Sequence, residues 1–388
     1  MGHSKQVENP VVCEGSNFEM GVAQGAQLRG LIVNLSRDIR NLEAFQLLRP
    51  KWMPYGLYLG IAKFQAKRTF RKLDRDYPDY VDRLRGIAQG SGQGVSIICL
   101  LNIFESILSD LTETTDVAPL GGCSAVALRG TKVESGGAVI ARNFDYLPLI
   151  QPYYSLRQCR PKNGFRSLEF LAAPLGGCID GLNEKGLCIT LNYAYVTDKS
   201  DLAPPITYAI AKAIAICTNV DEAVQVISNT PRWGGGLVML ADASGEVASL
   251  ELSNTKATVR KPENGEDFLF HTNVFNCQEM KAVELDQNSR YSEKAPTALR
   301  GECVGESAEE RRERLGDLIS RKEEFSVPQD LNDLMADHGA NNDPSANSVC
   351  MHGDYWFTTA TMQYYPKRLR ARISYSPACE ANYEEFEV

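Results

Sequence analysis

The sequence predicts an α+β fold in which sheets are covered by helices. Helical patterns dominate residues 1–122, a largely helical N-terminal segment, whereas strand patterns dominate residues 123–388. Turn sequences at 244–245 and 366–367 fall between pairs of strand candidates, as hairpins require. Helices interrupt the strands, and hairpins with helical pairs between them are typical of α+β proteins with covered sheets.

The N-terminal segment contains a helix with a clear start signal. Ser16 is positioned to cap this helix, and Glu19, three residues later, completes a capping box. A charged helical pattern further along continues across Pro78. In chain order, the patterns predict a short strand at 11–13, a charged helix at 67–87, a mostly buried helix at 95–111 and an exposed linker at 112–122.

Strand candidates dominate from residue 123 onward. They lie at 123–128, 137–145, 167–172, 187–194, 236–242, 247–253, 268–273, 356–364 and 368–376. The helices expected between them lie at 206–217, 221–228, 308–321 and 328–336. The charge run at 308–324 is most simply interpreted as a solvated helix face.

Composition excludes several classes of function. The 388-residue chain carries a formal net charge of −8, which disfavours a nucleic-acid partner. Its longest apolar stretch, 95–104, is too short to span a bilayer, so no membrane partner is expected. No nucleotide-binding glycine motif is present, and no cofactor is predicted.

The eleven cysteines are scattered singly along the chain. No Cys-x-x-Cys pair and no familiar Cys/His ligand spacing occurs, so no metal site is predicted. The odd count and the lack of a signal peptide favour reduced thiols and a cytoplasmic location.

Cys123 stands out because two glycines and a polar linker precede it. Gly122 offers an unhindered carbonyl for attack by the thiol, and Gly121 allows backbone angles that other residues resist. Attack on Gly122 followed by hydrolysis would leave Cys123 with a free α-amino group. Such a group has a pKa of about 7.7–8.0 and can accept the thiol proton without a histidine. The alternative to this catalytic role is that Cys123 is only a small buried hydrophobic residue.

Polar residues at the ends of other strands supply candidate partners for Cys123. Arg142 would hold the thiolate by charge and lower its pKa, and Asp145 would orient the amine. Residues three apart on a strand face opposite ways, so a bend is needed to aim both inward, and a surface ion pair is the alternative. Asn192 and Asn273 end strands and would donate to an oxyanion, unless they only cap turns.

Together these pieces resemble the isopenicillin-N acyltransferase-like (acyl-CoA:6-aminopenicillanic acid acyltransferase) family. These are autoproteolytic N-terminal-nucleophile hydrolases, related to the choloylglycine (bile salt) hydrolases, and the resemblance covers nearly the whole chain. The matching motifs, in order, are segment 13–25, the junction 122–124, the strand 142–146, the turn 181–187 leading to Asn192, segment 271–273, and the blocks 348–352 and 358–362.

The resemblance implies an αββα sandwich with the nucleophile on a sheet strand. It implies cleavage between Gly122 and Cys123, leaving residues 1–122 and 123–388 as a small helical subunit and a larger catalytic subunit. Two departures from the family pattern stand out. Gly121 occupies a position that is often acidic in the family. Arg142 matches an arginine of the bile salt hydrolases that the fungal penicillin enzyme lacks.

The resemblance also implies a set of roles. Cys123 would be the nucleophile, Asp145 would orient its amine, and Asn192 and Asn273 would surround the oxyanion. A later arginine would support the site. Arg311 fits that position best, and Arg314 lies close behind.

The predicted function is acyl transfer through a thioester on Cys123. The acyl group would come from a small amide or an acyl-CoA and pass to water or to an amine acceptor. Tyr146 and Tyr193 would line an apolar substrate pocket, unless they are ordinary core residues. The two fragments would stay associated, and homo-oligomers are left open.

Two alternatives come from other classes of protein. One is a conventional thiol hydrolase whose chain stays whole and whose base is His271, His338 or His352. The other is a non-enzymatic binding protein that kept the fold.

Overall fold

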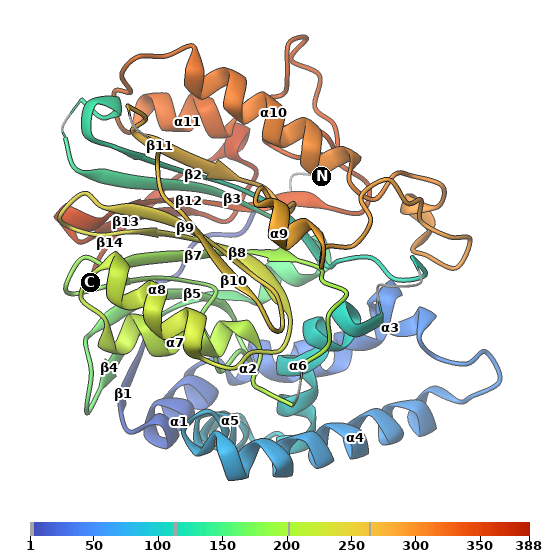
Figure 1. Ribbon diagram of the computed structural model, residues 1–388. Helices are drawn as coiled ribbons and strands as arrows, with labels where there is room; N and C mark the ends of the chain where they lie inside the picture. Colours follow the sequence, from blue (N-terminus) through green and yellow to red (C-terminus); the bar gives the residue numbers. More distant parts are fainter. Residues whose placement is uncertain (1–3, 112–114, 135, 201, 264) are drawn as a thin grey trace.

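A computed structural model of the chain describes residues 4–111, 115–134, 136–200, 202–263 and 265–388. Two sheets are stacked face to face between helical layers (Figure 1). One sheet has eight strands in the order β1-β4-β5-β6-β7-β8-β9-β10, and the other has six in the order β11-β2-β3-β12-β13-β14. This arrangement confirms the predicted α+β class and its αββα layering.

The N-terminal segment is helical except for its first strand, which joins the eight-stranded sheet by pairing parallel to β4. The capping box at Ser16 and Glu19 is present. The predicted helix across Pro78 is in fact two helices, because this proline occupies the first turn of the second one. The elements are β1 (Val11–Gly15), α1 (Asn17–Gln27), α2 (Arg29–Asp38), α3 (Glu43–Leu47), α4 (Tyr55–Asp76), α5 (Pro78–Ser91) and α6 (Val95–Leu111).

The predicted strands are all present in the two sheets. They are β2 (Gly121–Arg129), β3 (Ala138–Tyr146), β5 (Ser167–Ala172), β7 (Cys188–Ala194), β8 (Gly235–Ala241), β9 (Val247–Leu252), β11 (Phe268–His271), β12 (Phe357–Tyr365) and β13 (Arg370–Ser374). The patterns missed β4 (Tyr154–Pro161), β6 (Asp180–Asn183), β10 (Ala257–Arg260) and β14 (Glu384–Glu387). Strands β10 and β14 are short, largely exposed sheet edges, and β4 and β6 carry buried charges that mask their apolar pattern.

Helices cover both outer faces of the sandwich. In Figure 1, α7 (Ile206–Ile216) and α8 (Val220–Asn229) lie on the eight-stranded sheet, and α10 (Glu306–Ser320) and α11 (Gln329–Met335) lie on the six-stranded sheet. The short helix α9 (Gln278–Lys281) follows β11. Among the described residues, no helix combines the length and the apolar character that crossing a bilayer demands.

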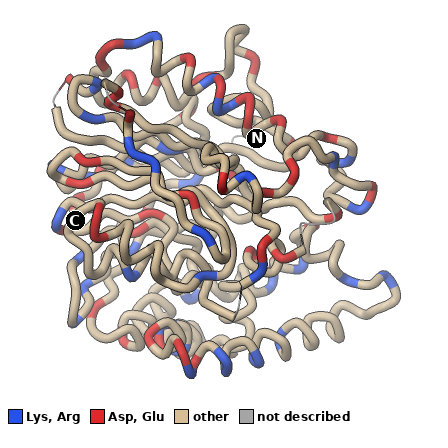
Figure 2. The backbone as a smooth tube through the Cα atoms, in the orientation of Figure 1, with Lys and Arg blue, Asp and Glu red and all other residues tan. Residues whose placement is uncertain are grey.

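The charged helix α10 is only partly the solvated element that its sequence predicts. Acidic and basic residues are interspersed along it (Figure 2). One face is nevertheless buried, and it consists of Ala308, Arg311, Leu315 and Ile319 at helical spacing. Arg311 is therefore directed inward, toward β2, by the same periodicity that buries its apolar neighbours.

Candidate active site

Strands β2 and β3 are neighbours inside the six-stranded sheet and bring Cys123 opposite Phe144. The Cys123 side chain is fully buried. Its sulfur accepts a hydrogen bond of 3.0 Å from Arg142 Nη2, whereas Ser124 contacts α10 through Arg311. Alternation along β2 thus sends the thiol to the layer between the sheets and the next side chain to the outer helical layer.

Arg142 is held between the two sheets. Its guanidinium pairs with the carboxylate of Asp180 on β6, and both side chains have no solvent exposure. The Tyr364 hydroxyl lies 3.5 Å from the same carboxylate. The surface ion pair considered for Arg142 is therefore wrong, because its counterion is a buried residue of the opposite sheet. Asp180 gave no signal in the sequence beyond an acidic residue in an apolar, glycine-rich stretch.

The electrostatics of the thiol depend on its burial as well as on Arg142. Burial raises the pKa of Cys123 to about 11, and the charge of Arg142 only partly opposes that rise. Arg142 lowers this pKa, as its charge was expected to do, but burial outweighs its effect. In the continuous chain the thiol is therefore protonated at neutral pH, and a base must remove its proton before it can attack.

Arg311 contacts Cys123 from the outer side of the sheet. Its Nη1 donates to the Cys123 carbonyl oxygen at 2.7 Å, and its Nη2 donates to Asn273 Oδ1 at 3.1 Å. Arg314 instead pairs with Asp337 and lies outside this group. Of the two arginines considered, the structure brings only Arg311 to Cys123.

Asp145 lies on the same side of β3 as Arg311, opposite to Arg142. Its Oδ1 accepts a hydrogen bond of 2.6 Å from Thr358. Its Oδ2 is buried, has no hydrogen-bond partner among the described residues and lies 3.8 Å from Arg311 Nη1. The bend expected to aim both side chains inward is absent, because Arg142 and Asp145 keep the opposite directions that their spacing dictates. Burial raises the pKa of Asp145 to about 6 against the charge of Arg311.

The two asparagines have different positions. Asn273 follows β11, and its Oδ1 accepts a hydrogen bond of 2.7 Å from the Cys123 backbone nitrogen. Its amide nitrogen donates to the Tyr193 carbonyl. Asn192 on β7 donates to the Thr272 carbonyl, and its Oδ1 is buried without a partner among the described residues. Asn273 therefore contacts Cys123, whereas Asn192 supports the segment that carries Asn273.

The junction before Cys123 is buried, which contradicts the predicted exposed linker. Gly121 and Gly122 belong to β2 and have no positive φ. A Cβ at Gly121 would lie 2.5 Å from the Tyr146 ring and 2.7 Å from the Asp145 carbonyl. Glycine is needed here for close approach rather than for the unusual backbone angles expected of Gly121. Residues 112–114 of the predicted linker lie outside the described residues.

Two cavities adjoin the junction and share Tyr193. One, of about 50 Å³, is lined by Gly122, Asn273 and Arg311. The other, of about 90 Å³, lies between the N-terminal helices and the sheets. Most of its lining is apolar, and its walls include Leu35, Ile39 and Leu42 of the N-terminal segment together with Leu120, Phe144, Tyr146, Tyr154 and Leu175. Tyr146 and Tyr193 therefore border a hollow that also touches Leu120 of the junction and Phe144, the cross-strand neighbour of Cys123.

Glu105 of α6 is an acidic residue that lines the apolar cavity and that sequence patterns missed. Its carboxylate accepts hydrogen bonds from Tyr146 at 3.0 Å and from Tyr195 at 2.9 Å. Burial raises its pKa to about 7, and the two hydroxyls only partly oppose that rise. An acidic residue in the largely apolar helix 95–111 is the signal that could have identified it.

We predict that Glu105→Gln removes part of the pH dependence of stability. Between its ordinary pKa of 4.5 and the folded value of about 7, folded Glu105 keeps a proton that the unfolded chain releases. The free energy of unfolding of the parent protein should thus fall with rising pH across this window, by at most about 3 kcal/mol from this group. Urea unfolding at pH 5 and pH 8, in a Cys123→Ala background that keeps the chain continuous, measures the change.

A matched control for this prediction is Glu263→Gln, because Glu263 is exposed. The control should keep the parent pH dependence, whereas Glu105→Gln should flatten it. Equal slopes for both variants would contradict the assignment of this titration to Glu105.

The described histidines do not contact the Cys123 sulfur. His271 is buried, with Nδ1 2.9 Å from the Ser249 hydroxyl. Burial also lowers its pKa well below the ordinary range, which keeps the ring neutral. His338 and His352 lie together near Cys350, in a separate group. The conventional thiol hydrolase with one of these bases therefore has no geometric support at Cys123.

Comparison with known proteins gives one family and several similar structures. The family model described as acyl-coenzyme A:6-aminopenicillanic acid acyl-transferase matches residues 132–374, a segment that begins after Cys123. A Caenorhabditis elegans N-acylethanolamine-hydrolyzing acid amidase ortholog is 14% identical, with a TM-score of 0.41, covering 63% of this chain and 93% of that one.

Two bacterial structures are similar to the same degree. The conjugated bile acid hydrolase of Clostridium perfringens, in a mutant form, is 15% identical with a TM-score of 0.42, covering 69% of this chain and 97% of that one. Penicillin V acylase from Agrobacterium tumefaciens is 16% identical with a TM-score of 0.44, covering 69% and 86%.

Proposed function

Because the chain belongs to the acyl-coenzyme A:6-aminopenicillanic acid acyl-transferase family, we propose that it is a self-cleaving cysteine enzyme of acyl transfer. The nucleophile is Cys123, and the observation that carries the proposal is its surroundings. Its sulfur lies 3.0 Å from Arg142, its backbone nitrogen 2.7 Å from Asn273 Oδ1, and its carbonyl oxygen 2.7 Å from Arg311.

Activation begins at the peptide bond between Gly122 and Cys123. The Cys123 thiol gives up its proton as its sulfur attacks the Gly122 carbonyl carbon, the C–N bond breaks, and the released Cys123 nitrogen takes up that proton. Water then hydrolyses the resulting thioester, which releases a carboxylate on Gly122 and restores the thiol. The products are residues 1–122 and residues 123–388 with Cys123 at the new terminus.

Asp145 and Asn273 receive the new amino group. Asn273 Oδ1 already accepts from the Cys123 nitrogen, and the buried Asp145 Oδ2 has no hydrogen bond among the described residues. A terminal amine offers additional donors, so Asp145 Oδ2 can accept one of them and orient the lone pair of the amine toward the thiol. The burial that raises the thiol pKa makes such an internal base necessary.

In turnover, the amine removes the thiol proton and the thiolate attacks the substrate carbonyl. Collapse of the tetrahedral intermediate expels the amine or thiol of the substrate, which leaves an acyl group on Cys123. An amine acceptor or water then attacks this thioester and releases the product. In the continuous chain, the amide nitrogens of Asn192 and Asn273 donate hydrogen bonds to backbone carbonyls. To stabilise the oxyanion, they must leave these carbonyls and donate to the oxyanion instead.

The apolar cavity beside Tyr146 and Tyr193 suits the acyl part of the substrate. Its walls combine residues of the N-terminal helices with residues of the sheets. The substrate would therefore be a small amide or an acyl-CoA with an apolar acyl group. The same walls explain why the fragments 1–122 and 123–388 would remain associated after cleavage.

Intact-mass spectrometry of the freshly purified chain tests activation, and a panel of amides and acyl-CoAs tests turnover. We expect a fragment whose first residue is Cys123, an acyl adduct on that residue, and transfer of the acyl group when amine acceptors are added. A single full-length species that forms no adduct would contradict the proposal. Such a result would favour the non-enzymatic binding protein.

A further inference from the structure

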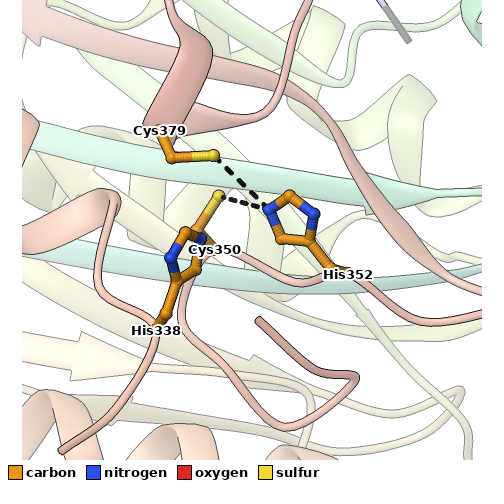
Figure 3. A group of neighbouring side chains, drawn as sticks. All are labelled: His338, Cys350, His352 and Cys379. Atoms are coloured by element: carbon orange, nitrogen blue, oxygen red, sulfur yellow. Dashed lines mark hydrogen bonds between the residues drawn. The ribbon is translucent and has the colours of Figure 1, made fainter. Parts of the chain in front are cut away.

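A second group of reactive side chains lies outside the site around Cys123. His338, Cys350, His352 and Cys379 bring four ligand atoms within 4.8 Å of one another. Figure 3 shows both sulfurs directed at one nitrogen of His352, with the His338 ring beside them. We propose that these four residues form a tetrahedral Zn²⁺ site.

The distances fit that metal. A tetrahedral zinc with bonds of about 2.3 Å to sulfur and about 2.0–2.1 Å to nitrogen separates a sulfur and a nitrogen ligand by about 3.5 Å. His352 Nε2 lies 3.5 Å from Cys350 Sγ and 3.5 Å from Cys379 Sγ. Two thiolates with two imidazoles are also a ligand set that zinc prefers.

His338 is the fourth ligand of the proposed site, and a hydrogen-bond partner orients its ring. Its Nε2 is buried without a hydrogen-bond partner among the described residues, which leaves this atom available to a metal. Its Nδ1 lies 3.3 Å from Asn342 Oδ1, an arrangement that holds the ring and selects the tautomer. A ligating histidine typically makes such a bond with its second nitrogen.

The three chain segments that meet here explain why the sequence predicts no metal site. His338 follows α11, Cys350 and His352 precede β12, and Cys379 follows β13. Their linear spacing matches no familiar zinc motif, and only the packing of the segments brings them together. The proposed site departs from the expectation of no metal, which was based on spacing along the chain alone.

The site connects to the region around Cys123 through a short path. Met351, between two of the ligands, donates its backbone N–H to Thr358 at 2.7 Å, and Thr358 donates to Asp145. A side chain at Gly122 would meet the Met351 methyl group at 3.2 Å. Zinc at this place would hold the segment that supports Asp145, so its role is structural rather than chemical.

Binding of Zn²⁺ to the two thiols forms two Zn–S bonds and releases two protons. The exposed Cys379 gives the ion access from solvent. The test is metal content of the reduced full chain by mass spectrometry, followed by Co²⁺ titration of the metal-free protein. We expect about one zinc per chain and the visible spectrum of tetrahedral Co²⁺ bound by two thiolates.

Three variants make the test specific. Cys379→Ser should weaken Co²⁺ binding by more than about a hundredfold, because it removes a ligand. Asn342→Gly keeps the left-handed backbone of residue 342 and removes the orienting bond, so it should weaken binding about 10–100-fold. Cys303→Ser, outside the group, should bind like the parent protein.

Several results would overturn the zinc site. They are reduced protein that binds neither metal, equal affinity in Cys379→Ser and the parent, or a mass lower by two hydrogen atoms that shows a Cys350–Cys379 disulfide in protein purified under reducing conditions. Should Cys379→Ser fail to fold, the Asn342→Gly affinity and the Co²⁺ spectrum of the parent decide the question.

Discussion

Cys123→Ala should leave one full-length chain and lower acyl transfer by at least about a thousandfold. The reason is that the same sulfur performs both self-cleavage and acyl capture in the proposed mechanism. Intact mass reports the first effect, and acyl-adduct formation with the reactive substrates of the panel reports the second.

The matched control for that prediction is Cys303→Ser, which removes a partly exposed thiol that donates to the Gln287 carbonyl and not to Cys123 or its partners. It should cleave and react like the parent. Cys123→Ser replaces the thiol by a weaker nucleophile and should cleave slowly. Cleavage at an unchanged rate in Cys123→Ala would show that another group breaks the chain.

Asp180→Asn should lower the free energy of unfolding by about 3–5 kcal/mol, because it leaves the charge of Arg142 buried without a counterion. Arg142 also contacts the Cys123 sulfur, so its displacement should slow self-cleavage. Urea unfolding in a Cys123→Ala background, which keeps the chain continuous, separates the stability effect from the chemical one.

Two comparisons isolate the buried charge. The double variant Asp180→Asn with Arg142→Met removes both charges and should recover much of the lost stability. Asp221→Asn breaks an exposed pair with Lys261, of 2.9 Å, and should cost less than about 1 kcal/mol. A loss for Asp180→Asn as small as that for Asp221→Asn would mean that Arg142 keeps another counterion.

Strand patterns predicted the sheets well because several strands are buried on both faces and therefore appear in the sequence as short apolar runs. β2, β7 and β8 have almost continuous apolar runs and were located from them. β4 was missed because Arg157 is buried there in an ion pair with Glu169 of the neighbouring strand. When the partner of a buried charge is distant in the sequence, the local pattern cannot distinguish the buried charge from an exposed one.

Helix α10, at the candidate site, shows the same limit of prediction from local sequence patterns. Its sequence reads as a solvated charged helix, yet Arg311 occupies the buried stripe with Ala308, Leu315 and Ile319. The stripe was detectable from spacing alone. The contact between this arginine and the Cys123 carbonyl was not detectable from the sequence, because it joins residues 188 positions apart.

By itself, the sequence determined the α+β class, most of the strands and helices, and the choice of Cys123 as the residue on which chemistry would centre. Local periodicity and short motifs carry that information, since each depends on neighbours in the chain. The tertiary structure alone decided which charges meet. It paired Arg142 with Asp180, hid the junction inside β2, directed Asp145 and Arg142 to opposite faces, and gathered two cysteines and two histidines from three segments. The physical reason is that burial makes an unpaired charge or polar group costly, and the partner that satisfies it is chosen by packing across the sandwich rather than by proximity along the chain.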